Sequence, residues 1–294
     1  MKCEDNRSQA EKINYLKGIF KERVGYELNL DCPKTFNEKI QWYKMFYHDP
    51  LITRCTDKYL VKDWVRRMIG SGHTAGVYGV WDRGEEIDFE LLPKSYVLKV
   101  NWGYRQQIIV PDKRQLDKQD AIKKLNHWLQ PENHPYWRFL GWSGLNIDSK
   151  IIAEEYLIDP EVGEVRDYKF WCFQNQIKIV SVHRNGNRTV TNLDKDWNVL
   201  PYYFKNYPGD PYIAKPKTYE QMREYALILS KPFPFARVDF YSIGKRILLG
   251  EMTFSVGDGI QPFAKREWDD EIGKWFDINA ARAMIANGYK YKGV

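Results

Sequence analysis

The sequence predicts an α+β fold, in which helices and antiparallel hairpins mix along a chain of 294 residues. Amphipathic stretches with helix-capping signals recur from the first fifty residues to the C-terminal end. Alternating stretches rich in β-branched and aromatic residues come in pairs joined by short turns, which is typical of hairpins. The regular strand–helix repeat of a doubly wound parallel sheet is missing, so the mixture favours antiparallel sheets with helices packed on them.

The first fifty residues are predicted to be largely helical. Thr35 and Glu38 have the spacing of a capping box, in which the side chain of each residue accepts a hydrogen bond from the backbone amide of the other. The helix they begin is expected to end at the HDP tripeptide, 48–50. A second helix is expected from near Asp57 to Gly70, with an acid at its start and arginines near its end, as the helix dipole favours.

Three more helices are predicted further along the chain. The stretch DKQDAIKKLNHWLQ is amphipathic, and we expect Asp117 to cap it and Pro131 to follow its end. In KTYEQMREYALILSK, Thr218 and Gln221 have the spacing of another capping box. The last helix is expected to contain NAARAMIANG, 279–288.

Strand patterns fill the remaining sequence. A hairpin is predicted from PKSYVLKV and IIVP, which flank the turn NWGYRQ, and SKIIAEEYLI is predicted to be a single strand. DYKFWCFQNQIKIVSVHR and PFARVDFYSIGKRILLGEMTF each read as a hairpin. Cys172 lies in one of these apolar strands and is expected in the core.

Composition excludes several classes of protein. A net charge of +6 is far from the concentrated basic surface of a nucleic-acid-binding protein, so no nucleic-acid partner is predicted. No window approaches the roughly twenty apolar residues of a membrane span. The charged N-terminus contains no apolar signal region, and the four cysteines have neither metal-ligand nor redox spacing. We therefore expect a cytoplasmic protein in a reducing compartment.

Two acids in the last hairpin need compensation. The turn at 242–245 should place Asp239 and Glu251 nearly opposite each other, in flanks that otherwise look buried. Like charges directly opposite are destabilising, and buried carboxylates need partners. Arg237 has the same strand parity as Asp239 and could form a salt bridge with it. Alternatively, the acids could bind Mg²⁺, which takes few carboxylates and completes its shell with water and phosphate oxygens.

Two other strand ends carry charges that suit a nucleotide site. Lys99 ends a strand before a turn, where its ammonium could reach phosphate, although an exposed lysine with a buried stem has the same pattern. Glu154 and Glu155 should point to opposite faces of their strand, and solvated charges are the alternative there. Lysines on separate elements together with the acidic pair form the pattern of a nucleotide–metal site.

Six motifs occur in an order that resembles the TupA-like ATP-grasp family of surface-polysaccharide biosynthesis: KTFNEKIQW, DKYLVKDWV, LPKSYVLKVNWG, IIAEEYL, DYKFWCF, and RVDFY followed by GEMTF. The resemblance runs from about residue 30 to about residue 280. It implies an ATP-grasp fold, in which two α+β subdomains clamp the nucleotide, with a helical N-terminal extension. The implied division is an extension over 1–54, a first part of the core over 55–92, a lid over 93–154, and a core with the metal and substrate site over 155–294.

The resemblance also implies a nucleotide site. Lys58 and Lys99 match the two lysines that hold the ATP phosphates. Four successive residues match the hinge that receives the adenine: Glu154, Glu155, and the backbone at Tyr156 and Leu157. Asp167 matches the acid that commonly holds the ribose hydroxyls.

The implied metal ligands are Asp239 and Glu251, with Thr253 as a weaker neutral ligand where ATP-grasp enzymes usually have asparagine. Arg237 is implied to hold the transferring phosphoryl group or an acyl-phosphate, unless it only pairs with Asp239. Lys169 could reach phosphate or a substrate carboxylate, and an exposed strand lysine without a role is the alternative. Together with Lys99, these two residues form the predicted catalytic set.

Two loops add open questions. Residues 101–105, NWGYR, replace the small glycine-rich loop that the family tends to have after the strand lysine, and Arg105 could supply a charged fork in place of backbone amides. The turn HRNGNR, 183–188, carries two arginines that could bind an acidic substrate, or it could be a solvated loop.

The resemblance implies an ATP- and Mg²⁺-dependent ligase that joins a carboxylate to an amine through an acyl-phosphate. Its expected substrates are a small molecule or glycan bearing a carboxylate and an amine such as an amino acid, and its expected partners are other polysaccharide-assembly enzymes. The alternatives are a kinase-type phosphotransferase, a glycosyltransferase of glycan biosynthesis, and a non-catalytic nucleotide-binding scaffold.

Overall fold

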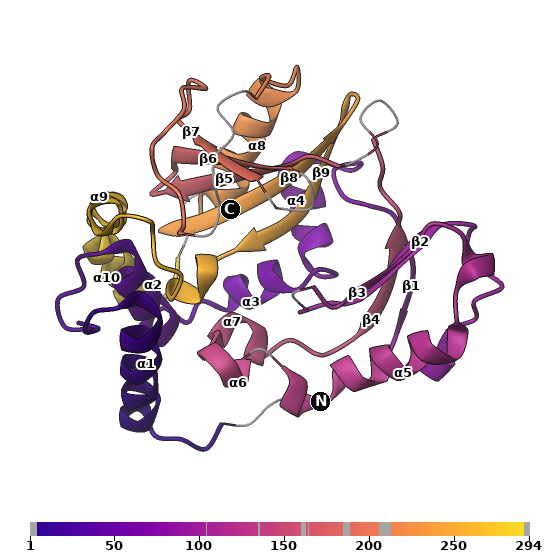
Figure 1. Ribbon diagram of the computed structural model, residues 1–294, viewed down its shortest axis with the longest axis horizontal. Helices are drawn as coiled ribbons and strands as arrows, with labels where there is room; N and C mark the ends of the chain where they lie inside the picture. Colours follow the sequence, from indigo (N-terminus) through magenta and orange to yellow (C-terminus); the bar gives the residue numbers. More distant parts are fainter. Residues whose placement is uncertain are drawn as a thin grey trace.

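The computed structural model describes residues 5–103, 105–134, 136–159, 163, 165–184, 189–205 and 213–290. Two antiparallel sheets lie side by side, and helices cover them (Figure 1). The fold is therefore α+β, as the sequence predicts. Residues 104 and 185–188, which belong to the two loops singled out above, lie outside the described residues.

The smaller sheet has the strand order β1-β4-β2-β3. Its strands are β1 (Val77–Trp81), β4 (Ile151–Glu155), β2 (Tyr96–Val100) and β3 (Gln107–Val110). The predicted hairpin of β2 and β3 is confirmed. Helix α5 (Lys118–Leu129) runs along this sheet and buries Leu125 against Tyr96 and Leu98 (Figure 1). Asp117 caps α5 as predicted, because its carboxylate accepts a hydrogen bond from the amide of Asp120.

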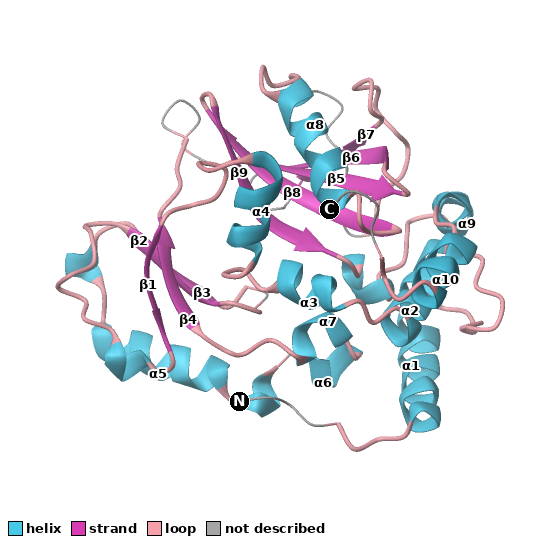
Figure 2. Ribbon diagram, turned by 180° about the vertical axis from the view of Figure 1, so that it is seen from behind, coloured by secondary structure: helices cyan, strands magenta, loops and turns pink. Residues whose placement is uncertain are grey.

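The larger sheet has the order β7-β6-β5-β8-β9. Its strands are β5 (Asp167–Phe173), β6 (Gln176–Arg184), β7 (Thr189–Leu193), β8 (Phe235–Ile243) and β9 (Arg246–Thr253). Both predicted hairpins, β5–β6 and β8–β9, are confirmed. Helix α8 (Tyr219–Ser230) lies across one face of this sheet (Figure 2), where Tyr219 stacks on Phe170 and the backbone of Ala226 contacts the buried thiol of Cys172.

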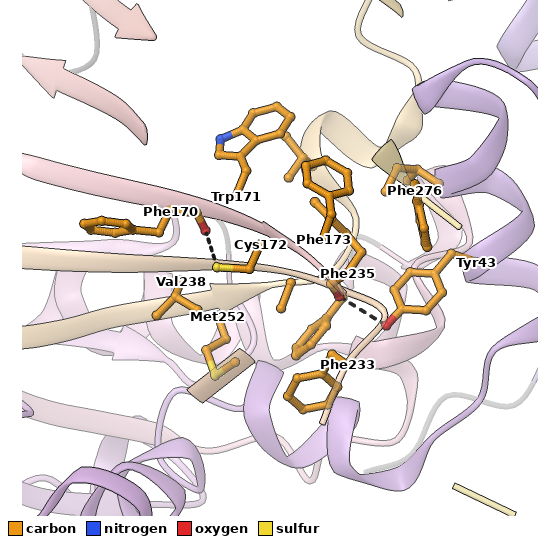
Figure 3. Packing of buried hydrophobic residues seen from close by; sticks show 14 of the residues in the cluster. Tyr43, Phe170, Trp171, Cys172, Phe173, Phe233, Phe235, Val238, Met252 and Phe276 are labelled. Carbon is orange, nitrogen blue, oxygen red and sulfur yellow. Dashed lines mark hydrogen bonds between the residues drawn. The ribbon is translucent and has the colours of Figure 1, made fainter. Parts of the chain in front are cut away.

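The other face of the larger sheet changes from polar to apolar along β5. Trp171 and Phe173 pack against Phe36, and Phe173 packs against Phe235 with ring centroids 4.8 Å apart. Figure 3 shows this aromatic core, in which the Tyr43 hydroxyl donates a hydrogen bond to the carbonyl of Phe235. The residues of the same parity that precede Trp171 on β5 are polar. The face is thus apolar at one end and charged at the other, since residues two apart in a strand share a face.

The remaining helices complete the fold. They are α1 (Gln9–Val24), α2 (Phe36–Phe46), α3 (Pro50–Thr56), α4 (Val61–Ile69), α6 (Tyr136–Phe139), α7 (Trp142–Leu145), α9 (Arg266–Trp275) and α10 (Ile278–Ala286), with 3-10 turns at Gly84–Glu86, Lys113–Gln115, Pro131–Asn133 and Val256–Gly259. Helices α1, α2, α9 and α10 gather on one side of the molecule (Figure 1). Throughout the described ranges, no helix combines the length and apolar character that crossing a membrane requires. The capping box of Thr35 and Glu38 is confirmed.

One predicted helix start and one predicted capping box are wrong. Helix α4 begins at Val61 rather than near Asp57, because the Asp57 carboxylate accepts from the amides of Tyr59 and Leu60 and closes a turn before the helix. The capping box at Thr218 does not form. The Thr218 hydroxyl instead hydrogen-bonds that of Ser242, 2.7 Å away on β8, and tertiary contact thus overrides the local signal.

Strands β1 and β7 and helices α3, α6, α7 and α9 were not predicted. The pairing of β1 with β4 brings residues from the predicted first part of the core, 55–92, into the smaller sheet. The division into subdomains stays a prediction, and sheet membership suggests a boundary just before β1 rather than at residue 93.

Candidate functional site

The acidic pair lies on the charged face of the larger sheet. The register of β8 and β9 places Asp239 opposite Glu251, as the turn position predicts. The register shifts immediately beyond this pair, at Gly250, which forms a β-bulge. A Cβ atom on Gly250 would lie 2.9 Å from the Tyr241 ring, so the close contact of the ring requires glycine there.

Two cations of the chain itself neutralise Asp239, which is only 1% exposed. Arg237 donates from Nε to Oδ1 at 2.8 Å and from Nη2 to Oδ2 at 2.7 Å. The Lys169 ammonium donates to Oδ2 at 2.6 Å. Burial opposes ionisation, but these two cations outweigh it and hold the pKa of Asp239 at about 2. The salt bridge considered for Arg237 is therefore formed.

The same arginine also serves the opposite strand. Its Nη2 lies 3.0 Å from Glu251 Oε1 and 3.0 Å from the hydroxyl of Thr253. A planar guanidinium can make these contacts together, since it presents several donors in fixed directions. Glu251 Oε2 is less engaged, because its nearest cation is Lys58 at 3.8 Å.

Lys169 is buried between two carboxylates, so the alternative of an exposed strand lysine is wrong. Besides Asp239, it forms an ion pair with Asp167. Burial raises the pKa of Asp167 to about 6, against the opposing effect of Lys169. The second carboxylate oxygen of Asp167, Oδ1, is buried and has no hydrogen-bond partner among the described residues. A buried acceptor without a donor is uncommon in folded proteins, and a donor from a ligand is one explanation for it.

A second charged cluster lies at the smaller sheet. Glu154 is 5% exposed and forms two ion pairs, with Lys99 Nζ 2.5 Å from Oε2 and Lys62 Nζ 2.9 Å from Oε1. Burial opposes ionisation of Glu154, but Lys99 and Lys62 outweigh it and lower its pKa. Sequence reasoning missed Lys62. The available signal was its spacing of four residues from Lys58, because side chains four residues apart lie on the same side of a helix.

Glu155 points away from Glu154, as strand alternation predicts. Arg246 on β9 donates from Nη1 and Nη2 to its two carboxylate oxygens, at 2.8 and 2.9 Å. This bidentate pair joins the larger sheet to the smaller one. Tyr156 and Leu157 follow β4 directly and are half-buried.

Lys58 lies between the two charged clusters. Its backbone amide donates to the carbonyl of Asn101, whose side chain donates to Asp57, so the turn before α4 is fixed to the end of β2. Burial lowers the pKa of Lys58, Glu251 opposes that effect, and the nearby Lys99 adds to it. The chain thus brings Lys58 and Lys99 together with the acidic pair in space.

The oxygen donors of the larger sheet suit Mg²⁺ only in company with an anion. Two opposed carboxylates and a hydroxyl are the hard ligands that Mg²⁺ prefers. Within the described ranges, however, no group of three or more His, Cys, Asp or Glu side chains could hold a metal ion. Three carboxylates of this cluster, Asp167, Asp239 and Glu251, already face three cations, Lys58, Lys169 and Arg237. A divalent cation would upset that balance unless an anion such as a triphosphate entered with it.

Comparisons with known proteins concern the family and the fold of the chain. A family model described as TupA-like ATPgrasp matches residues 38–277. None of the curated protein sequences matches the chain significantly.

Solved structures similar to this one are ligases and a synthetase by their titles. L-amino acid ligase from Bacillus licheniformis has a TM-score of 0.51 and 13% identity, over 87% of this chain and 57% of that one. D-alanine–D-alanine ligase from Bacillus anthracis, complexed with ATP, has a TM-score of 0.41 and 15% identity, over 68% of this chain and 55% of that one. The ADP complex of N5-carboxyaminoimidazole ribonucleotide synthetase has a TM-score of 0.45 and 12% identity, over 74% of this chain and 50% of that one. The chain therefore spans 50 to 57% of the length of these proteins, and the likeness concerns the fold.

Proposed function

The chain belongs to the TupA-like ATP-grasp family, and on that premise we propose that it is an ATP- and Mg²⁺-dependent carboxylate–amine ligase of surface-polysaccharide biosynthesis. The observation that supports this most is the meeting of Lys58 with Glu251, beside the ion pair of Lys99. In this proposal the ammonium groups of Lys58 and Lys99 and the carboxylates of Asp239 and Glu251, which come from distant parts of the chain, share one nucleotide site. In this proposal the smaller sheet with α5 is the lid and the larger sheet is the core.

The phosphates would lie between the clusters. Lys58 and Lys99 would bind them, and each is held by a single acid in the structure, so an incoming triphosphate can compete for both. Mg²⁺, held by Asp239, Glu251 and Thr253, would supply neutralisation of charge on the phosphate oxygens.

The nucleoside would lie along the end of β4. The segment Glu154–Leu157 would receive the adenine, mainly through the backbone at Tyr156 and Leu157, because the Glu154 side chain is engaged by two lysines. The unpartnered Oδ1 of Asp167 would accept a hydrogen bond from a ribose hydroxyl.

The proposed reaction has two displacement steps. A substrate carboxylate oxygen attacks the γ-phosphorus of ATP, and the bond from that phosphorus to the β–γ bridging oxygen breaks. ADP departs, and the substrate becomes an acyl-phosphate. An amine then attacks the acyl carbon, inorganic phosphate leaves, and a proton from the amine is released to water. The guanidinium of Arg237 and the ammonium of Lys169 would stabilise the negative charge that develops on oxygen in both steps, since ion pairs already fix both groups in place.

The substrate class follows from the family description rather than from residue chemistry. We propose a uronic acid of a surface glycan, or an amino acid, as the carboxylate, and an amino acid or amino sugar as the amine. Other enzymes of polysaccharide assembly would then supply the glycan.

Mass spectrometry of reaction products tests the ligase. The full chain is incubated with Mg·ATP and a panel of uronic acids and amino acids. The expected product is lighter by one water than the sum of a carboxylate and an amine, with ADP and phosphate released only when both are present. Lys99→Ala and Asp239→Asn should abolish product formation, whereas Lys124→Ala, at an exposed ion pair on α5, should not change it.

Other products would contradict the proposal. A substrate that gains a phosphoryl group indicates a kinase-type phosphotransferase. Release of a nucleotide from a sugar donor without ATP indicates a glycosyltransferase. ATP binding without any product indicates a nucleotide-binding scaffold.

A further inference from the structure

Lys62 differs from the two lysines assigned to the phosphates in how it is held. Its ammonium lies 2.9 Å from Glu154 Oε1 and donates to the carbonyl of Ala75 at 2.9 Å. Lys99 and Lys58 each have a single acidic partner among the described residues, Glu154 and Glu251 respectively. Lys62 and Lys99 are equally exposed, at 16% of the side chain. Lys62 is therefore held by an ion pair and a hydrogen bond, and Lys99 by an ion pair alone.

Glu154 needs a cation at all times because it is buried. A buried carboxylate that loses its counter-charge is strongly destabilising. When Lys99 turns toward an anionic ligand, Glu154 loses its contact at Oε2. Lys62 can keep Glu154 neutralised at that moment, since the carbonyl of Ala75 and the start of α4 fix its position.

We propose that Lys62 is a positioning residue, which releases Lys99 from Glu154 to the nucleotide by remaining on Glu154 as its permanent counter-charge. The inference rests on the proposed function, because it assumes that Lys99 binds the ATP phosphates. It assigns to Lys62 no contact with the nucleotide. Without Lys62, Glu154 would hold Lys99 as its last cation, and binding of a triphosphate would have to break that pair.

A double-mutant cycle measured by calorimetric titration of the full chain with Mg·ATP tests this role. Lys62→Met should weaken binding by about tenfold or more, because Lys99 is then retained by Glu154. In a Glu154→Gln background the same substitution should cost less than about threefold, since no buried charge holds Lys99 back. Lys62→Arg, which keeps the positive charge, should bind Mg·ATP within about threefold of the wild-type chain.

The outcomes separate this role from the alternatives. Equal losses from Lys62→Met in both backgrounds would mean that Lys62 contacts the phosphates or supports the fold directly, and would overturn the inference. Unchanged affinity in Lys62→Met would also overturn it. Failure of the wild-type chain to bind Mg·ATP would overturn the proposed function and this inference together. Far-ultraviolet circular dichroism and a thermal unfolding curve for each variant show whether a loss of affinity comes from unfolding.

Discussion

A guanidinium and an ammonium together keep Asp239, the most buried acid of the site, ionised. Arg237 makes two parallel hydrogen bonds to Asp239 and extends its Nη2 to Glu251 and Thr253. Removing one member of a buried ion pair costs about 3–5 kcal/mol, because it leaves the other charge without compensation. The same guanidinium thus compensates two opposed carboxylates and, through Glu251, links β8 to β9.

Asp49 provides a test of pH dependence away from the site. Burial raises the pKa of this carboxyl from 3.8 to about 6 in the folded chain. Between these values the folded protein holds a proton that the unfolded chain has lost, so the free energy of unfolding falls as pH rises through this range. Asp49→Asn removes the dependence. Relative to the wild-type chain it should gain about 1 to 3 kcal/mol of stability between about pH 4 and pH 7.

Urea unfolding at the two pH values measures this difference. Asn retains the capping hydrogen bond that Asp49 accepts from the amide of Leu51, so the helix start is preserved. Asp117→Asn is the matched control, because Asp117 is an exposed cap of α5. Parallel curves for the wild-type chain and Asp49→Asn across this pH range would contradict the assignment.

At the scale of elements, the β8–β9 hairpin sets the geometry of the acidic pair. Its bulge at Gly250 lies directly beside the pair, and a Cβ at Gly250 would lie only 2.9 Å from the Tyr241 ring. Gly250→Ala should displace the ring or the strand, lower stability by about 1–3 kcal/mol, and weaken Mg·ATP binding by about tenfold. Chemical unfolding and calorimetric titration measure the two effects.

The turn of the same hairpin offers a control. Gly244 has a φ of +58° and no atom within 4 Å of the position of a Cβ. Gly244→Asn should therefore cost little, because asparagine tolerates the left-handed region. If Gly250→Ala behaves like this control, the bulge does not position Glu251.

The elements predicted best are those whose signal is local. The hairpin β8–β9 was predictable because its turn and its period of two lie within twenty residues. The capping box at Thr35 was predictable for the same reason. The capping box at Thr218 does not form, because the Thr218 hydroxyl hydrogen-bonds the hydroxyl of Ser242, which is distant in sequence. Strand β1 contains Gly79 and pairs with a strand some seventy residues away, so no local pattern marked it.

For the whole molecule, the pair of Arg246 and Glu155 connects the two sheets. A backbone bridge between Thr74 and Leu249 lies close by in sequence. Arg246→Ala should change stability by less than about 1 kcal/mol, since its side chain is half exposed. It should nevertheless weaken Mg·ATP binding several-fold, because the proposed lid would lose a link to the core.

The measurements are thermal unfolding and calorimetric titration of the same preparation. Arg223→Ala removes a comparable exposed ion pair from α8 and should change neither result appreciably. An Arg246→Ala variant that binds Mg·ATP like the wild-type chain would show that the pair does not couple the sheets.

The sequence motifs named residues that the fold brings near one another, but they could not name contacts that depend on how separate elements pair. Motif order named Lys58, Lys99, Asp239 and Glu251, and folding brings them together, although their roles stay predictions. Lys62 belongs to a helix start, and only the fold reveals that its ammonium meets Glu154. The neutralisation of Asp239 by Lys169 was hidden likewise, because strand pairing determines it.

The two-sided character of β5 constrains how this chain can vary in length. Phe170 and Cys172 face α8, while Lys169 and Trp171 face the opposite way. Deleting one residue ahead of Lys169 would turn its ammonium under the helix and push an aromatic ring among the acids. A single-residue insertion or deletion within this strand should therefore destabilise the protein more than a substitution on either face, unless a β-bulge absorbs it.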